Sequence, residues 1–240
     1  MNYKTDILAF GAHPDDVEIS VSGTIIRYVA QGKSVCVVDL TQGELGTRGN
    51  AQTRKEEALK AAKLLGLKQR VNLKLKDAFF ESSEKSIKLV IEQIRRFKPQ
   101  IVFANAIEDR HPDHSKAAKL IADACYLSGL QKIETKWEGR VQQCHRPRLV
   151  FHYIQDYYIK PDFVIDVSDF VDQKIEAIKA YKTQFFDPKS AEPNTPISRE
   201  DFFEFLKGRM KQMGRPVNLN YAEGFTINRL FGVDDLFNIL

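Results

Sequence analysis

The chain has few cysteines and no long apolar run. Its 3 cysteines in 240 residues are far apart and form no Cys-x-x-Cys pair, which excludes a disulfide scaffold. Cys36 falls in an apolar stretch and Cys125 in a helical pattern, so we expect buried structural thiols. No apolar run approaches the roughly 20 residues of a membrane span, and residues 7–11 are too few for a signal-peptide core. These absences predict a soluble, cytoplasmic protein that does not bind membranes.

An excess of charge of one sign is also missing. The 36 basic and 32 acidic residues leave a net charge of only +4, which argues against a nucleic-acid-binding protein. The densest basic stretch, residues 207–215, coincides with a helical pattern and is better explained as a solvated helix face. Hydrophobic residues at 43% and charged residues at 28% are close to the globular average, which excludes a disordered chain.

The first half of the sequence alternates strand and helix patterns. The expected strands cover residues 6–10, 34–40, 71–75 and 101–104, and the expected helices cover residues 17–31, 53–65, 86–97 and 114–127. This alternation predicts an α/β fold with a doubly wound, Rossmann-like, mostly parallel sheet in the strand order 3-2-1-4-5.

The second half is less regular. Strands are expected at residues 149–154 and 163–167, helices at 170–185 and about 199–213, and a proline-rich loop at 187–198. Nothing marks a domain boundary. We therefore expect one domain over residues 1–240, with a Rossmann-like core (1–130) and a smaller strand and helix extension (131–240).

Two of the five histidines lie in repeated His-Pro-Asp tripeptides. Residues 13–16 (His-Pro-Asp-Asp) follow the first expected strand, and residues 111–114 (His-Pro-Asp-His) follow the fourth. A residue before proline is kept out of the helix, whereas proline itself is accepted in the first helical turn. In the order 3-2-1-4-5 strands one and four are neighbours, and ligands bind at that switch point. The two motifs are thus expected to form one cleft.

The polar residues of this cleft suit a divalent metal ion. They are His13, Asp15, Asp16, His111, Asp113 and His114. Two histidines and one carboxylate with open positions form a catalytic set for zinc, and the same set can hold ferrous iron. Each motif alone is more simply explained as a helix cap and a loop histidine; together they favour the metal. A dinucleotide site is disfavoured, because the turn after the first strand is not rich in glycine.

The two motifs also carry a family resemblance. Residues 11–16 and 111–114 resemble the signature motifs of the zinc-dependent PIG-L, or LmbE-like, N-acetylglucosaminyl deacetylases. The similarity extends to residues 39–41, 43–44, 54–57, 109–110 and 221–225. Within that family the sequence most resembles the bacterial deacetylases of bacillithiol biosynthesis, which act on N-acetylglucosaminyl malate. A homo-oligomer is implied as well, with the proline-rich loop and the helix after it as its interface.

The resemblance implies a role for each motif residue. One zinc ion would be held by His13, Asp16 and His114, with Asp15 as the general base that activates water. His111 would stabilise the oxyanion or protonate the leaving nitrogen, and the Asp113 carboxylate would orient His111 and keep it charged.

Three arginines are candidates for substrate contacts. Arg54 opens the helix after the glycine-rich loop, Arg110 precedes the second motif, and Arg48 lies in the loop itself. The sequence departs from some relatives, which carry an oxyanion-assisting tyrosine near Thr195, because residues 187–205 contain none. A metal-dependent phosphoesterase with two metal ions stays an alternative, as does a non-catalytic metal or sugar sensor.

Overall fold

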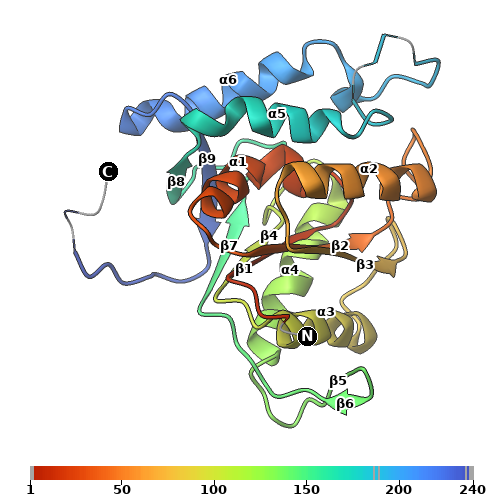
Figure 1. Ribbon diagram of the computed structural model, residues 1–240, viewed down its shortest axis with the longest axis vertical. Coiled ribbons are helices and arrows are strands. Elements are labelled where there is room, and N and C mark those ends of the chain that lie inside the picture. Colours follow the sequence, from red (N-terminus) through yellow and green to blue (C-terminus); the bar gives the residue numbers. More distant parts are fainter. Residues whose placement is uncertain (1–2, 186, 189, 236, 238–240) are drawn as a thin grey trace.

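A single mixed sheet of seven strands forms the centre of the protein (Figure 1). The computed structural model describes residues 3–185, 187–188, 190–235 and 237. The strand order is β3-β2-β1-β4-β7-β9-β8. Its strands are β1 (Ile7–Gly11), β2 (Val35–Thr41), β3 (Gln69–Leu75), β4 (Ile101–Ala104), β7 (Leu149–Tyr153), β8 (Phe163–Asp166) and β9 (Ala222–Ile227). A separate two-stranded hairpin pairs β5 (Lys136–Trp137) with β6 (Arg140–Val141).

The predicted order 3-2-1-4-5 is confirmed, with β7 in the fifth position. The five strands β3, β2, β1, β4 and β7 are mutually parallel, and β1 has β2 on one side and β4 on the other. The winding therefore reverses at β1, and the carboxyl ends of β1 and β4 are adjacent.

Helices cover both faces of the sheet. They are α1 (Asp16–Ala30), α2 (Ala51–Leu64), α3 (Glu84–Phe97), α4 (Pro112–Leu127), α5 (Val171–Lys179) and α6 (Phe202–Gly214). Figure 1 shows α1 and α2 on one face with α5 and α6 beyond them, and α3 and α4 on the other face. Among the described residues, no helix is both long enough and apolar enough to cross a membrane.

The core has a layer on each side of the sheet because the parallel strands are apolar on both faces. Along β1, Leu8 and Phe10 pack toward α3 and α4, whereas Ile7 and Ala9 pack toward α1. A third apolar cluster joins α2, α5 and α6. Cys36 and Cys125 are buried in the apolar layer between the sheet and helices α3 and α4, as predicted.

Two expectations for the second half were incomplete. The predicted helix over residues 170–185 is too long: α5 ends at Lys179 because the Glu57 carboxylate accepts the backbone N–H of Thr183 (2.8 Å), which a longer helix would need. Residues 221–225, to which the sequence assigned no element, belong mostly to β9. This strand lies antiparallel between β7 and β8, so the second half extends the same sheet.

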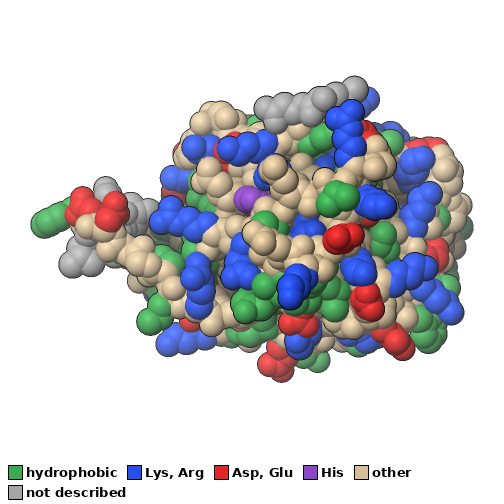
Figure 2. Space-filling model, turned by 90° about the horizontal axis from the view of Figure 1, so that it is seen from below, with side chains coloured by type: hydrophobic (Ala, Val, Ile, Leu, Met, Phe, Trp, Pro, Cys, Tyr) green, Lys and Arg blue, Asp and Glu red, His purple; other side chains and the backbone are tan. Residues whose placement is uncertain are grey.

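The charged side chains on the outside are mixed. Figure 2, which views the face below α3 and α4, shows Lys and Arg spread over the surface with Asp and Glu among them. Among the described residues that this view shows, the basic side chains form no continuous groove, in keeping with the small net charge.

Deep in the fold, Glu223 of β9 connects three elements. Its carboxylate lies 2.6 Å from Lys174 Nζ of α5 and accepts the backbone N–H groups of Gly23 (2.9 Å) and Thr24 (2.7 Å) in the middle of α1. Lys174 is 1% and Glu223 3% exposed. Glycine is required at residue 23, since a Cβ there would lie 2.9 Å from Val167 and 3.0 Å from Glu223 Oε1.

The first prediction concerns this buried pair. Replacing Glu223 with Ala leaves the Lys174 ammonium and two α1 N–H groups without their partner, so unfolding free energy should fall by about 3–5 kcal/mol. Urea unfolding measures this loss. Glu176→Ala is the control, since it breaks an exposed ion pair with Lys179 on the same helix and should cost about 1 kcal/mol or less. Equal losses in the two variants would refute a structural role for Glu223.

Candidate metal centre

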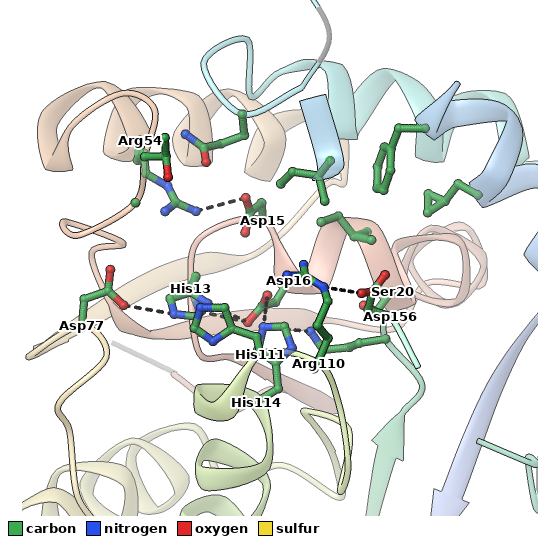
Figure 3. Close-up of a pocket in the computed structure, with 18 of the residues that line it drawn as sticks. His13, Asp15, Asp16, Ser20, Arg54, Asp77, Arg110, His111, His114 and Asp156 are labelled. Atoms are coloured by element: carbon green, nitrogen blue, oxygen red, sulfur yellow. Dashed lines mark hydrogen bonds and ion pairs between the residues drawn. The ribbon is translucent and has the colours of Figure 1, made fainter. Parts of the chain in front are cut away.

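The two His-Pro-Asp motifs meet at the switch point between β1 and β4. The imidazole centroids of His13 and His111 are 4.7 Å apart, and His114 lies 5.1 Å from His111 and 5.6 Å from His13. About 100 residues of sequence separation thus reduce to direct ring contact (Figure 3). The reason is topological, because the chain leaves two adjacent parallel strands at the same edge of the sheet.

A cavity of about 300 Å³ opens at this junction. That volume is at the lower end of the usual range for small-molecule sites. At one end it is lined by polar residues of both motifs and of neighbouring loops: His13, Asp15, Asp16, Arg54, Asp77, His111, His114 and Gln155. The apolar residues at its other end come mainly from α6 and the turn before it.

His114 presents one nitrogen to the cavity. Its Nδ1 is 2.5 Å from Asp109 Oδ2, and its Nε2 is 3.1 Å from Asp16 Oδ1. Burial opposes a charge on the ring, yet the carboxylates of Asp16 and Asp109 raise the pKa of His114 to about 9. A carboxylate on Nδ1 is the usual way to orient a histidine whose Nε2 binds a metal.

His13 lies in a similar setting, but its Nε2 faces the supporting carboxylates and its Nδ1 faces Asp16, the reverse of His114. Its Nε2 is 3.1 Å from Asp77 Oδ1 and 3.4 Å from Asp113 Oδ2, whereas its Nδ1 is 3.7 Å from Asp16 Oδ2. Asp77, in the loop after β3, therefore holds the far side of the ring. The nitrogen that faces Asp16 is Nδ1.

Asp16 stands between the two histidines and is buried. Its Oδ2 accepts the backbone N–H of His13 (3.0 Å) and the side-chain amide of Asn105 (3.0 Å). Although burial works against its charge, His114 and His13 hold the pKa of Asp16 well below its usual range. Two imidazoles and one carboxylate are a donor set that fits zinc or ferrous iron.

Among the described residues, the groups of three ligand atoms that lie within 4.8 Å of one another do not include Asp16. The ligand atoms of His13, His111 and His114 lie within 4.8 Å of one another, and so do those of His13, Asp77 and Asp113. Both groups include His13, so any ion bound here would have His13 among its neighbours.

Asp15 has a strained backbone, and its carboxylate does not cap α1. Its φ of 121° is in the region that favours glycine, and its side chain makes no cap hydrogen bond to α1. The carboxylate instead accepts from Arg54 Nη2 at 3.0 Å. Burial raises the pKa of Asp15 to about 7; the Arg54 charge opposes this shift and the Asp16 charge adds to it. A carboxylate with that pKa can exchange a proton near neutral pH.

His111 and Asp113 differ from the expectation. The backbone N–H of Asp113 donates to His111 Nδ1 (3.2 Å), but the Asp113 carboxylate accepts from the Ala78 N–H (2.9 Å) and contacts His13 and Lys116. The hydrogen bonds and ion pairs of this carboxylate are therefore with residues other than His111, although its charge partly offsets the lowering of the His111 pKa. Burial and the nearby His13 and His114 lower the pKa of His111, which favours a neutral ring whose Nε2 carries the proton.

The three predicted arginines lie in different settings. Arg54 lines the cavity, 4% exposed, and also donates to Pro14 O (2.6 Å) and Gly43 O (3.2 Å). Arg110 is at the rim with its Nε 2.5 Å from Asp156 Oδ2. Arg48 is buried away from the cavity, where its guanidinium contacts Ser190 and Phe185 O.

Several residues of the site had no role assigned to them from the sequence. Asp77, Asn105 and Asp109 all contact a motif histidine or aspartate. Asp109 had a signal, because it follows the fourth strand five residues before His114. Asp77 and Asn105 had none, since their roles depend on contacts across neighbouring loops.

Comparison with known proteins identifies the family. The PIG-L family, described as GlcNAc-PI de-N-acetylase, matches residues 8–125. An uncharacterized deacetylase of Escherichia coli is 32% identical over 132 residues, which are 52% of this chain and 70% of that protein. A diacetylchitobiose deacetylase of Thermococcus kodakarensis is 29% identical over 189 residues (75% and 70%). The chain belongs to the PIG-L family.

Further similarities agree with this membership. A protein named as a probable N-acetyl-α-D-glucosaminyl L-malate deacetylase, from Bacillus anthracis, is 24% identical over 77% of this chain and 84% of its own. The crystal structure of a conserved Thermus thermophilus protein superposes with a TM-score of 0.84 and 31% identity, covering 96% of this chain and 98% of that one. These three relatives from the sequence comparison are named deacetylases, and this chain is an enzyme of that kind.

A second prediction tests the setting of His114 in this PIG-L chain. Asp109→Asn keeps the shape of the side chain but removes its charge, so zinc affinity should fall about 10- to 100-fold. Competition with a chromogenic chelator measures that affinity without any assay of activity. Asp123→Asn is the control, because Asp123 pairs with Lys119 on the outer surface of α4. Unchanged zinc affinity in Asp109→Asn would show that this carboxylate does not support the metal centre.

Proposed function

We propose that the enzyme hydrolyses the N-acetyl group of an N-acetylglucosaminide with one divalent ion, zinc or ferrous iron. His13, Asp16 and His114 would hold the ion. The observation that carries this proposal is the buried Asp16 carboxylate, which lies 3.1 Å from His114 Nε2 and 3.7 Å from His13 Nδ1. The Asp15 carboxylate lies beside this group at the polar end of the cavity. When bound, the metal would supply an electrophile that activates water and polarises the amide carbonyl.

The chain's own residues have separate roles in this proposal. Asp15 takes a proton from the attacking water and returns it to the leaving amine, for which a pKa near 7 is suitable. His111, whose Nδ1 is occupied by the Asp113 N–H, directs an N–H at the developing oxyanion. Asp77 and Asp113 hold His13, and Arg54 holds Asp15.

For the substrate, the sequence resemblance points to N-acetylglucosaminyl malate and bacillithiol biosynthesis, and the Bacillus anthracis relative supports it. The Thermococcus relative acts on diacetylchitobiose, as its name says, and supports a disaccharide. Both share the N-acetylglucosamine unit, which is the part that we propose here. A cytoplasmic location and a homo-oligomer remain predictions from the sequence.

The central prediction is a loss of activity in Asp15→Asn. The amide cannot accept the proton of the attacking water, so kcat for amine release should fall by at least about 100-fold. Release of free amine from N-acetylglucosaminyl malate, diacetylchitobiose and N-acetylglucosamine by the zinc-loaded enzyme measures it. Asp156→Asn, at the cavity rim beside Arg110, is the control and should retain most of the activity. A fully active Asp15→Asn enzyme would exclude the proposed base.

Arg54 gives a prediction on pH dependence. Its positive charge holds the pKa of Asp15 down, so Arg54→Met should raise that pKa. Asp15 then stays protonated to higher pH, and the acid limb of the kcat/KM profile should move upward by about one pH unit. Arg110→Met, whose guanidinium contacts Asp156 and not Asp15, should leave the limb in place. A raised KM with an unmoved limb would instead make Arg54 a substrate clamp.

A two-metal phosphoesterase is the alternative. The second ion would bind at His13, Asp77 and Asp113. Against it, Asp77 accepts the backbone N–H groups of Leu45 (3.0 Å) and Ala78 (2.9 Å), and Asp113 accepts the latter too. Metal analysis decides: close to one ion per chain supports the deacetylase, and two per chain with release of phosphate from a phosphomonoester supports the alternative.

A further inference from the structure

One wall of the cavity comes from a single face of α6. Four of its residues line the cavity at spacings of three and four: Phe202, Phe205, Leu206 and Arg209. Residues at these spacings point to the same side of a helix. Ile197, in the turn before α6, extends the wall. This face of α6 lies across the cavity from its polar end. Figure 3 shows side chains made only of carbon atoms projecting into the cavity from the α6 side.

Within this wall, Phe205 is the most exposed side chain. It is 51% exposed, whereas Phe202 is 7% and Leu206 3% exposed. Phe202 is fixed from behind by a stacked contact with Phe185 at 5.5 Å between ring centroids, and its own ring lies 6.3 Å from that of Phe205. The exposed ring of Phe205 therefore lies beside a ring that is itself well packed.

Arg209 flanks the same ring. Its guanidinium carbon is 5.9 Å from the centre of Phe205, and its Nη2 donates to the backbone carbonyl of Tyr157 at 2.7 Å. This hydrogen bond fixes the guanidinium beside the ring. Its other N–H groups can then donate to a hydroxyl of a molecule that lies on Phe205.

The orientation of a bound glycoside follows from the two ends of the cavity. The acetamido group that reacts must reach Asp15, Asp16 and His111 at the polar end. Its own sugar ring then lies among the polar side chains there, which can satisfy its hydroxyl groups. The group linked to that sugar is left to contact the apolar wall of α6.

We propose that Phe205 is the platform of an aglycone subsite that takes a ring-bearing aglycone such as a second pyranose. The C–H face of a pyranose is apolar and packs on an aromatic ring, while its edge hydroxyls meet Arg209. Malate is a short chain without such a face. The inference rests on the proposed deacetylase function and specifies which N-acetylglucosaminides the enzyme prefers.

The test compares substrates with and without the second ring. For diacetylchitobiose, Phe205→Ala should lower kcat/KM by about tenfold or more, mostly through KM, because the contact is lost in both ground and transition states. For N-acetylglucosamine and N-acetylglucosaminyl malate the same variant should change kcat/KM less than about twofold. Phe205→Trp should restore the disaccharide rate, since it returns an aromatic face.

A matched control is Phe79→Ala. Phe79 is a similarly exposed phenylalanine, 63% exposed, and it does not line this cavity. It should leave all three rates unchanged. Equal losses on all three substrates in Phe205→Ala, or no loss on the disaccharide, would overturn the aglycone subsite while leaving the deacetylase itself intact.

Calorimetric binding of chitobiose, the deacetylated disaccharide, to the zinc-loaded enzyme separates the two proposals. It requires no turnover. Binding that weakens about tenfold or more in Phe205→Ala supports the subsite even if no substrate is hydrolysed, a result that would refute only the deacetylase function. Chitobiose that fails to bind, or that binds both forms equally, refutes the subsite.

Discussion

The parallel pairing of β1 with β4 is the constraint on which the site depends. Ile7 pairs with Ile101 and Ala9 with Phe103, so the two strands run side by side and end at the same edge of the sheet. The winding reverses between them, which leaves a crevice where α1 and α4 begin. Every residue proposed to touch the metal or the acetyl group is in the motifs that start these two helices.

The density of buried charge at this crevice requires that each charge have a partner. Asp15 is paired with Arg54, and Asp16 lies between two histidines and an amide. The same rule holds away from the site, where Arg70 bridges Glu18 and Asp39 beneath α1. An unpaired buried charge is costly, so these contacts fix the side chains in place. Fixed dipoles and charges are what a hydrolytic site needs, because they need no reorganisation during the reaction.

The polar and apolar ends of the cavity come from different parts of the chain. The first half supplies nearly all the ionisable groups, on the loops after parallel strands and in the first turns of the helices that follow, and α6 in the second half supplies most of the apolar wall. The parallel core of such a fold fixes the position of its chemistry, while a helix outside that core can change without disturbing it. We therefore infer the reaction from family membership, and the kind of group attached to the reacting sugar from the face of α6.

Local sequence patterns were enough to predict the parallel order of the first strands and the meeting of His13 with His111 and His114, a cluster that could hold a metal ion. These follow from local patterns, since apolar runs, prolines and helix starts depend on near neighbours, and the switch-point rule adds the topology. Tertiary contacts were needed to show that Arg54 pairs with Asp15, that the Asp113 carboxylate contacts His13, and that Asp77 and Asp109 contact the histidines. They also end α5 at Lys179, through Glu57. These depend on contacts between residues far apart in the chain, which no local pattern encodes.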